Sequence, residues 1–405
     1  MKAVVCKDRK MSVVDRLDRE PGRGQVLLKV LRCGICGSDL HVRKYCDQWG
    51  EMMARSGYKA LLRADQEVVF GHEFSGEVLD HGPGCKRTLK PGSKVVAVPV
   101  LRRGTDIDLI GLAEQTDGAY AERVIVEESM MMPIPNGLAP DLAALTEPMA
   151  VGWHAMKRGE VTRKDVCVVI GCGPVGLAII ALLKARGVRK IVASDFSAGR
   201  RKLAAACGAD VVIDPAAGSP YESWGGTDYI TSVPQLLDLV MTTNETLRKL
   251  PLPWWQVWRV IDKLVGSPKG PVVFECVGAP GVLQSIIEGA PHFSRIVVAG
   301  VCMQSDTIQG AVAINKGCDL RFAAGYSPLE FRDTLHLIAE GKVTCGAMIT
   351  AEVGLEGVAA AFEALGDPDR HAKILIDPES VASAPLGPTP GDHAAASLVP
   401  EFGRL

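Results

Sequence analysis

The stretch VCVVIGCGPVGLAII, residues 166–180, decides the fold of the second half of the chain. An apolar run typical of a buried strand leads directly into a G-x-G-x-x-G pattern, and a helix-forming run follows. In this context the first glycine permits a tight turn, the second lets the backbone approach a pyrophosphate, and the third lets the helix pack against the strand. The helix N-terminus stabilises the phosphate charge. The stretch therefore predicts a dinucleotide site formed by Gly171, Gly173, Pro174, Val175 and Gly176.

The strand that follows carries an acidic residue which bears on the choice of dinucleotide. Asp195 ends the run KIVASD, nineteen residues past Gly176. A carboxylate there accepts hydrogen bonds from the adenosine ribose hydroxyls and repels a 2′-phosphate, so we expect NAD. Arg200 and Arg201 keep NADP open as the alternative, because a nearby arginine can hold that phosphate. We count Arg200 among the residues that contact the cofactor.

The chain changes its pattern near residue 150. Before that point, short β-like runs such as KAVVC and QVLLKVLRC, bounded by Gly and Pro, predict an antiparallel barrel-like domain. From Val166 to DLRFAAG, strands alternate with helical stretches, which predicts an α/β fold with a doubly wound parallel sheet. The expected division is 1–151 for the first domain, 152–321 for the nucleotide-binding domain, 322–377 for a return to the first domain, and 378–405 for a flexible tail.

Residues 215–270 interrupt this rhythm by lengthening the third crossover well beyond an ordinary loop. The insertion holds four of the six tryptophans of the chain: Trp224, Trp254, Trp255 and Trp258. The simplest interpretation is a small satellite core. A contact between subunits is the alternative, because exposed apolar patches mark interfaces.

Composition excludes several classes of protein. The formal charge of -2 gives no electrostatic reason to expect nucleic acid or an anionic membrane as a partner. Apolar stretches are interrupted before about 18 residues, so no segment is expected to span a bilayer. The twelve cysteines are scattered, and the N-terminus reads as a strand, not as a secretory signal. We expect a cytoplasmic protein that acts on a small molecule.

The stretch LRCGICGSDLHVRKY, residues 31–45, contains a C-x-x-C pair that suits a redox pair, half of a zinc site, or no function at all. A redox pair more naturally accompanies a thioredoxin-like βαβ unit, which residues 1–150 do not resemble. A cysteine alone is usually a small buried hydrophobe, and a His–Glu pair is usually on the surface. Together, a thiol, an imidazole and carboxylates upstream of a nucleotide fold suit zinc. The predicted metal residues are Cys36, His72, Glu73 and Glu147.

These residues stand in motifs that resemble those of the zinc-dependent medium-chain alcohol dehydrogenases. GHEFSGEVLDHGPGC fits the zinc signature of the family, CGICGSDLH its first ligand loop, and GCGPVG followed by Asp195 its cofactor fingerprint. DGAYAERVIV, TEPMAVGWHA and VVFECVG follow in the expected order. The resemblance covers roughly residues 1–377. It implies a GroES-like catalytic domain joined to a Rossmann domain, with zinc and a nicotinamide meeting between them.

The resemblance also implies roles for individual residues. Cys36 and His72 would bind zinc, and Glu73 would be a ligand or an exchanging neighbour. Glu147 would be a third or fourth ligand, or would hold the water on the metal, as in polyol dehydrogenases. Asp39 would orient the imidazole of His72.

Ser38 and His41 are the predicted catalytic residues. Zinc lowers the pKa of bound water from 15.7 to about 7, and we expect a similar effect on an alcohol. Ser38 and His41 would carry its proton to solvent, although an exposed loop histidine is the plainer interpretation of His41. Lys373 would contact the pyrophosphate or lie in solvent.

The chain departs from the family pattern in two places. Many members carry four closely spaced cysteines for a structural zinc, but here LRRGTDIDLIGLAEQTDGAY has none, so we expect one catalytic zinc and no structural zinc. Residues 46–68 enlarge the connection between Cys36 and His72. Either they form a surface helix, or they cover the substrate entrance with Tyr45, Asp47, Gln48 and Trp49.

The sequence therefore predicts an NAD- and zinc-dependent dehydrogenase of a secondary alcohol, with a polyol or sugar-like alcohol favoured by Glu147 and CGICGSDLH. Threonine-type and aldehyde-type relatives are alternatives within the family. A nucleotide-binding regulatory module without turnover is an alternative from another class. A zinc-free quinone reductase leaves Cys36, His72 and Glu73 unexplained. The resemblance implies a homodimer or homotetramer.

Overall fold

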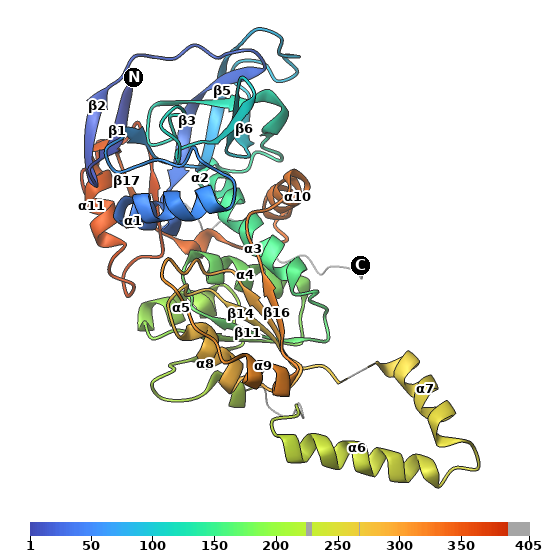
Figure 1. Ribbon diagram of the computed structural model, residues 1–405. Coiled ribbons are helices and arrows are strands. Elements are labelled where there is room, and N and C mark those ends of the chain that lie inside the picture. Colours follow the sequence, from blue (N-terminus) through green and yellow to red (C-terminus); the bar gives the residue numbers. More distant parts are fainter. Residues whose placement is uncertain (224–228, 267, 388–405) are drawn as a thin grey trace.

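The computed structural model describes residues 1–223, 229–266 and 268–387. Figure 1 shows two domains, with a pair of helices projecting from the second one. The first domain contains the N-terminal strands and also receives strands from the C-terminal part of the chain. Within the described residues, no helix combines the length and the apolar character needed to cross a membrane.

The first domain is built from strands that pair in antiparallel fashion, except for the parallel pair β17 and β18. They are β1 (Lys2–Lys7), β2 (Lys10–Asp15), β3 (Gln25–Gly34), β4 (Val68–Val69), β5 (Glu73–His81), β6 (Lys94–Ala97), β7 (Val100–Arg103), β8 (Asp106–Leu109), β9 (Arg123–Glu127), β10 (Met131–Pro133), β17 (Ile349–Val353) and β18 (Lys373–Ile376). The largest sheet has the order β10-β6-β5-β3-β18-β17, and β9 also pairs with β3. Alternate residues of β3, Val26, Leu28 and Val30, are buried, as expected for a strand with one face on a core.

The helices of this domain lie around these sheets. They are α1 (Gly37–Arg55), α2 (Pro140–Ala144), α3 (Thr146–Arg158), α10 (Pro328–Ala339) and α11 (Val358–Ala364). α1 has a kink at Tyr45, where the backbone leaves helical geometry. The enlarged connection after Cys36 is thus largely one long helix followed by an irregular segment that returns to β4.

The second domain contains a six-stranded parallel sheet with the order β13-β12-β11-β14-β15-β16. Its elements are β11 (Val166–Ile170), α4 (Pro174–Arg186), β12 (Lys190–Ser194), α5 (Ala198–Ala206), β13 (Val211–Ile213), β14 (Val272–Glu275), α8 (Val282–Gly289), β15 (Arg295–Val298), α9 (Gly310–Lys316) and β16 (Asp319–Phe322). This is the strand order of a dinucleotide-binding Rossmann domain, in which ligands lie at the carboxyl ends of the strands.

Both faces of this sheet are covered. Val166 and Val168 of β11 pack in one core with residues of α8, while Cys167 and Val169 pack in another core with residues of α4. A strand covered on both faces needs a continuous apolar run, and VCVVI provides one. The predicted fold class, a doubly wound α/β domain with a GroES-like β domain, is confirmed.

After β16 the chain returns to the first domain, where β17 and β18 join the large sheet. The expectation of a flexible tail from residue 378 is wrong for residues 378–387. Backbone hydrogen bonds join Glu352 of β17 to Leu386, and Gly354 to Ala382. The open edge of β17 provides these backbone partners, which the composition of the tail did not reveal. Residues 388–405, and Trp224 of the insertion, lie outside the described residues.

Candidate active site

The thiol of Cys36 lies at the start of α1. Cys36 is the N-cap residue, and its Sγ accepts a hydrogen bond from the backbone N–H of Ser38 over 3.4 Å. The carboxylate of Asp39 accepts one from the backbone N–H of Cys36 over 3.0 Å, which completes a capping box. The helix start therefore fixes the thiol in position. Burial, followed by the nearby charge of Glu73, raises the pKa of this thiol.

Glu73 is the first residue of β5 and His72 directly precedes it, after a tight turn. Gly71 has a φ of +103°, and a Cβ at this position would lie 2.5 Å from a ring carbon of Tyr120. Only glycine fits such a turn without strain. This turn brings the His–Glu pair against the beginning of α1, although the pair is more than thirty residues further along the chain.

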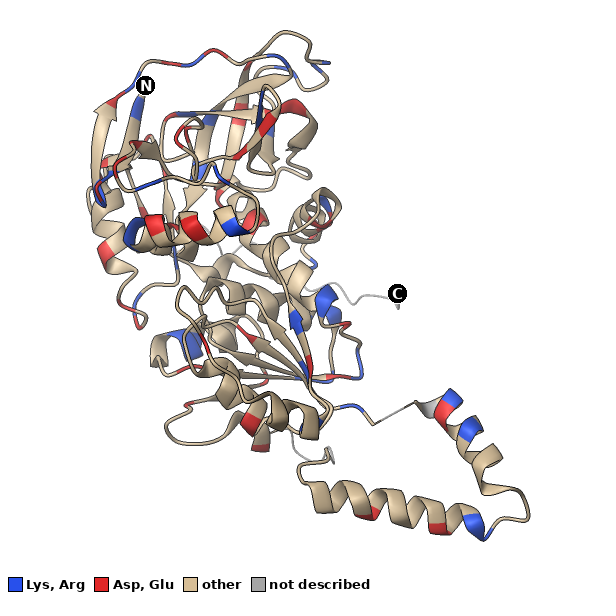
Figure 2. Ribbon diagram, viewed as in Figure 1, with Lys and Arg blue, Asp and Glu red and all other residues tan. Residues whose placement is uncertain are grey.

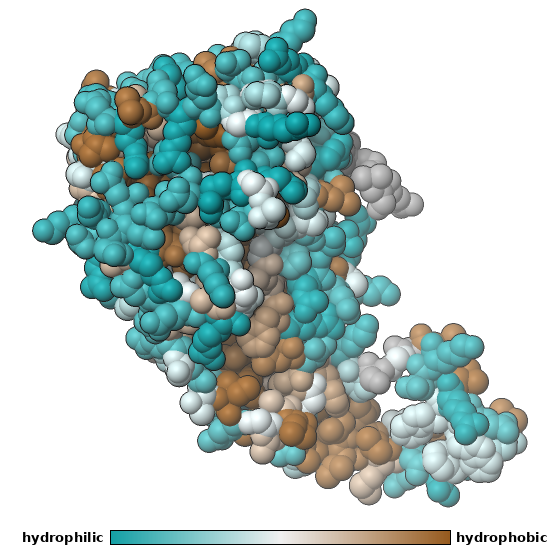
Figure 3. Space-filling model, turned by 45° about the horizontal axis from the view of Figure 1, so that its top comes forward, coloured by the Kyte–Doolittle hydropathy of each residue, from teal (hydrophilic) through white to brown (hydrophobic). Residues whose placement is uncertain are grey.

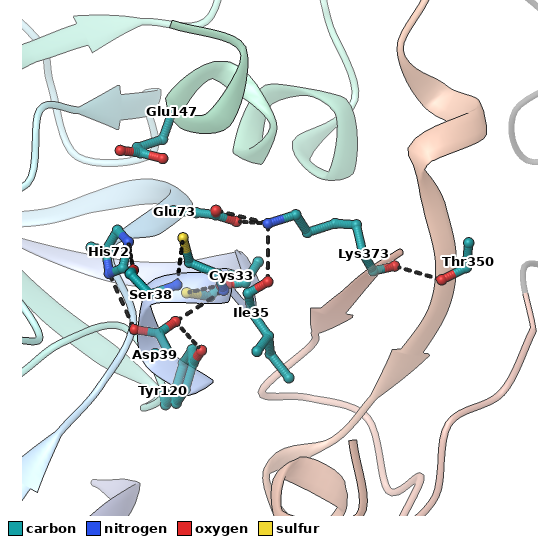
Figure 4. Close-up of polar contacts among 12 residues, drawn as sticks. Cys33, Ile35, Ser38, Asp39, His72, Glu73, Tyr120, Glu147, Thr350 and Lys373 are labelled. Carbon is teal, nitrogen blue, oxygen red and sulfur yellow. Dashed lines mark hydrogen bonds and ion pairs between the residues drawn. The ribbon is translucent and has the colours of Figure 1, made fainter. Parts of the chain in front are cut away.

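Three predicted metal residues come together here (Figure 4). The donor atoms of Cys36, His72 and Glu73 all lie within 4.8 Å of one another. Ligand atoms that share a tetrahedral zinc ion at about 2.0–2.3 Å are separated by roughly 3.5 Å, so small adjustments would suffice. A thiol, an imidazole and a carboxylate are also the donor types that zinc accepts. The three residues therefore fit a zinc ion.

Asp39 orients the imidazole of His72. Its Oδ1 lies 3.3 Å from His72 Nδ1, and its Oδ2 accepts a 2.6 Å hydrogen bond from the hydroxyl of Tyr120. Burial alone would lower the pKa of His72, but the buried carboxylate of Asp39 outweighs it and holds that pKa well above its usual range. Because Nδ1 faces Asp39, Nε2 is the nitrogen that faces Cys36 and the hydroxyl of Ser38.

Glu73 is bound by a buried lysine that the sequence analysis assigned elsewhere. Lys373 Nζ lies 2.7 Å and 2.6 Å from the two carboxylate oxygens of Glu73, and it donates to the carbonyl oxygen of Ile35 over 3.0 Å. Both charged side chains are fully buried. The expectation that Lys373 contacts the pyrophosphate or lies in solvent is therefore wrong. β18 places its ammonium group beside the carboxylate of Glu73, where it offsets the charge (Figure 4).

Glu147 faces the cluster from another element. It lies in the first turn of α3, it is 9% exposed, and its Oε1 accepts a 2.9 Å hydrogen bond from the hydroxyl of Tyr326. Burial raises the pKa of Glu147 to about 7. Its carboxylate is not among the donor atoms that lie within 4.8 Å of one another. The structure thus puts Glu147 opposite the other three residues, and its role as a ligand stays a prediction.

Ser38 and His41 follow Cys36 on α1. The Oγ of Ser38 lies 3.3 Å from His72 Nε2, next to the cluster. His41 is one helical turn further on, at the i+3 position, and so on the same side of the helix. It is half-buried, and burial, followed by the charge of Lys44, lowers its pKa. Ser38 thus lies beside the cluster and His41 one turn further along α1, and their role in proton transfer stays a prediction.

The predicted dinucleotide residues form the turn between β11 and α4. Gly171 has a φ of +91°, and a Cβ at Gly176 would lie 2.0 Å from the carbonyl oxygen of Gly171. A Cβ at Gly173 would meet no atom within 4 Å, so this side of the turn is open to a ligand. Pro174 and Val175 open α4. The residues fit a pyrophosphate at a helix N-terminus.

The adenosine end of this site is defined by Asp195 and α5. One oxygen of Asp195 accepts from the backbone N–H of Cys172 over 2.7 Å, and the other accepts from that of Ser197 over 2.8 Å. Arg201 is occupied by the carboxylate of Asp214 at 3.0 Å. The Nε of Arg200 is buried and has no hydrogen-bond partner among the described residues. Arg200 is therefore the arginine available for a ligand here.

Comparison with known proteins places these sites in a family. The family described as "Alcohol dehydrogenase GroES-like domain" matches residues 22–136. The chain is 28% identical over 375 residues to (R,R)-butanediol dehydrogenase of Neisseria gonorrhoeae, covering 88% of this chain and 93% of the relative. It is 26% identical over 356 residues to human sorbitol dehydrogenase, covering 85% and 86%. The crystal structure of 2R,3R-butanediol dehydrogenase from Bacillus subtilis superposes with a TM-score of 0.70 at 26% identity, covering 93% of this chain and 99% of the other.

These similarities support a zinc-type medium-chain alcohol dehydrogenase family with polyol-like relatives. The resemblance inferred from its motifs is thereby confirmed. The alcohol dehydrogenase family is a family of oxidoreductases, so the non-catalytic interpretation loses most of its support.

The sequence analysis named neither Tyr120 nor Tyr326, and it gave Lys373 another role. Tyr120 supports Asp39, Tyr326 supports Glu147, and Lys373 pairs with Glu73. Tyr120 stands in the recognised motif DGAYAERVIV and Lys373 in the stretch HAKILI, but nothing local indicates their partners. Tyr326 follows β16 in no motif at all.

Proposed function

We propose that this chain is a zinc- and NAD-dependent dehydrogenase that oxidises a secondary alcohol of a diol or polyol. The observation that carries the proposal is the convergence of Cys36, His72 and Glu73 within 4.8 Å, in a chain whose second domain has the strand order of a dinucleotide-binding fold. When bound, the metal supplies a Lewis acid for the alcohol oxygen and the nicotinamide supplies the hydride acceptor.

The residues of the chain prepare this chemistry. Cys36 and His72 hold the metal, with Asp39 keeping Nε2 of His72 directed at it. Glu73 contributes a carboxylate whose charge Lys373 offsets, and this pair keeps the cluster from carrying an uncompensated buried charge. Glu73 can bind the metal only when its ion pair with Lys373 is weakened. It is therefore better suited to be an exchanging neighbour of the metal than a permanent ligand.

Proton removal falls to α1. The hydroxyl of Ser38 lies beside His72 Nε2 and takes up the proton of the substrate hydroxyl as it passes its own proton on toward His41. The imidazole of His41 receives that proton, and its lowered pKa favours release of the proton to solvent. Glu147 lies on the opposite side of the cluster. Its carboxyl group provides a hydrogen-bonding partner for a second hydroxyl of the substrate or for a water molecule.

The preference for NAD is supported by the adenosine end of the second domain. Both oxygens of Asp195 accept from backbone N–H groups of the surrounding turns, which fixes the carboxylate where the ribose hydroxyls would bind. The preference for a diol or polyol is supported by relatives named butanediol and sorbitol dehydrogenase.

Metal analysis combined with a substrate panel tests the proposal. The purified protein is expected to contain one zinc per chain and to form NADH from NAD with 2,3-butanediol or a polyol. Cys36→Ser should lose zinc and at least 100-fold in kcat/KM while still binding NADH. Cys33→Ser is the matched control, because Cys33 lies three residues away and its Sγ contacts the carbonyl oxygen of Gly34.

Two results would reject the proposal. Full turnover by zinc-free protein would remove the metal from the mechanism. Tight NAD binding without oxidation of any alcohol, threonine or aldehyde in the panel would point instead to a regulatory module.

A further inference from the structure

Two helices of the cofactor domain stand apart from the rest of the molecule (Figure 1). They are α6 (Val233–Arg248) and α7 (Trp254–Val265), and with the connection 249–253 they are called the arm here. The arm leaves the domain after β13 and rejoins it before β14. The proposed dehydrogenase activity gives it no task, since the metal residues lie in the other domain.

The arm buries very little of its own surface. Among its described side chains, Leu247 is buried, Leu236, Trp254, Val257 and Trp258 are half-buried, and eleven large apolar ones are between 40% and 78% exposed. These exposed residues are Val233, Leu237, Leu239, Val240, Met241, Leu250, Leu252, Trp255, Val260, Ile261 and Leu264. Figure 3 shows apolar side chains on the arm and on the neighbouring part of the cofactor domain. The tryptophans of the expected satellite core contact one another, but most aliphatic side chains of the arm stay exposed, and an exposed patch of this size marks an interaction surface.

Each helix has an apolar stripe. On α6, Val233, Leu237 and Val240 recur at the i, i+4 and i+7 positions of one helix face. On α7, Val257, Ile261 and Leu264 recur in the same way. The α6 stripe covers the first half of its helix, and five of the six stripe residues are exposed while Val257 is half-buried, so both stripes are largely uncovered.

The elbow between the helices is fixed by aromatic side chains. The ring of Trp254 makes edge contacts with Trp255 at 6.1 Å and with Trp258 at 6.3 Å. The guanidinium of Arg248, the last residue of α6, lies 5.2 Å from the centre of the Trp254 ring. These contacts hold the two helices at their angle, and a partner from outside is needed to cover both stripes.

We propose that the arm is an association surface for a second copy of this chain, and that two arms pack as a four-helix bundle. Two arms bring four apolar stripes together, which is the number that encloses a bundle core, and a twofold axis makes the surface complementary to itself. The surface is also of sufficient size. Burying one large apolar side chain is worth ~1.5–3 kcal/mol, and dividing this by ~25 cal/mol per Å² gives its apolar area. The eleven exposed side chains of the arm are about half exposed, so together they offer about 500 Å² of apolar surface. An interface of ~800 Å² per partner that is ~60% apolar needs about the same.

Charge also favours a second copy. Helix α6 carries Asp238 and Glu245 before its terminal Arg248, whereas α7 carries Arg259 and Lys263 around Asp262, so α6 is net negative and α7 net positive (Figure 2). Laying α6 of one copy beside α7 of the other brings opposite charges together. A membrane surface recruits polybasic segments, and the acidic residues of α6 do not suit one.

Sedimentation velocity of the full-length protein tests this proposal. Leu237→Glu combined with Leu264→Glu places a charge in both stripes and should lower the mass of the assembly twofold relative to the unsubstituted protein. Thr242→Glu combined with Gln256→Glu is the matched control, because it adds the same charge at exposed polar positions and should leave the mass unchanged. All four positions are exposed, so a far-ultraviolet circular dichroism spectrum should not change.

A charge exchange tests the pairing of α6 with α7. Asp238→Lys and Lys263→Asp should each weaken the assembly, and the double variant should restore it. Equal masses for the unsubstituted protein and the Leu237→Glu, Leu264→Glu variant overturn the proposal. A second result also overturns the proposal. If the unsubstituted protein binds vesicles of phosphatidylglycerol and phosphatidylcholine, and the variant loses this binding without a change in mass, the arm binds a lipid surface instead.

Discussion

The ammonium group of Lys373 contacts both carboxylate oxygens of Glu73, at 2.7 Å and 2.6 Å, in a place that solvent does not reach. Two strands that are adjacent to β3 in the same sheet, β5 and β18, supply the partners. Because Glu73 is also one of the three proposed metal residues, the charge balance of this pair governs the stability of the site.

Removing one member of this pair should be costly. Lys373→Met leaves the carboxylate of Glu73 buried without a partner, and breaking a buried pair in this way costs about 3–5 kcal/mol of unfolding free energy. Combining it with Glu73→Gln should restore much of that loss, because no charge then remains. Urea denaturation of the single and double variants measures both effects. Additive losses in the double variant would show that the two side chains do not depend on one another.

Glu147 should make the metal-free protein less stable as the pH rises. Its pKa is about 7 in the folded protein and about 4.5 when unfolded, so between these values the folded state holds a proton that the unfolded state has lost. Unfolding free energy should fall by about 3 kcal/mol from pH 4.5 to pH 7 and then level off. Glu147→Gln should lack this part of the slope. Urea unfolding in the presence of a chelator at several pH values measures this difference. Parallel curves of unfolding free energy against pH for the two proteins would contradict the raised pKa of Glu147.

The side chain of Gln48 joins the two domains. Its Nε2 donates to the backbone carbonyl oxygen of Met303 over 2.8 Å, linking α1 to the segment after β15. One such bond is worth about 0.5–1.5 kcal/mol, so Gln48→Ala should change kcat/KM by about 2-fold to 10-fold. Glu51→Ala on an exposed position of the same helix is the control. Identical kinetics for the two variants would leave the enlarged connection without a role at the substrate entrance.

Two glycines of the dinucleotide turn should respond differently to the same substitution. Gly176→Ala forces a Cβ to within 2.0 Å of a carbonyl oxygen and should destabilise the fold. Gly173→Ala meets no atom of the protein within 4 Å, so stability should be kept while the new methyl group occupies the approach of the pyrophosphate. Titration of NADH fluorescence should show at least tenfold weaker binding for Gly173→Ala. Unchanged binding of NADH would show that the cofactor does not contact this turn.

The sequence predicted features that are encoded locally. The turn at Gly171 and the strand before it are set by a few adjacent residues, and the cluster of Cys36, His72 and Glu73 lies in motifs whose spacing is specific. Asp39 was assigned its orienting position for the same reason, and it lies there.

Partners from distant parts of the chain were not predictable. Lys373 is 300 residues from Glu73, and Tyr326 is 179 residues from Glu147, so only the closing of the large sheet and the packing of the two domains bring them together. A lysine in HAKILI reads locally as a solvated charge, because no neighbour in the sequence indicates a buried carboxylate. The order of residues 378–387 likewise depends on an edge of β17 that tail composition does not describe.

The position of β18 between β3 and β17 has a consequence for biosynthesis. All six strands of the parallel sheet are translated between residues 166 and 322, whereas the sheet that contains Glu73 is incomplete until β18, which begins at Lys373, has been translated. At ~10 residues per second, the carboxylate of Glu73 exists for about half a minute before its counter-ion is translated. The nascent N-terminal domain is thus completed last, after the domain that follows it in the chain.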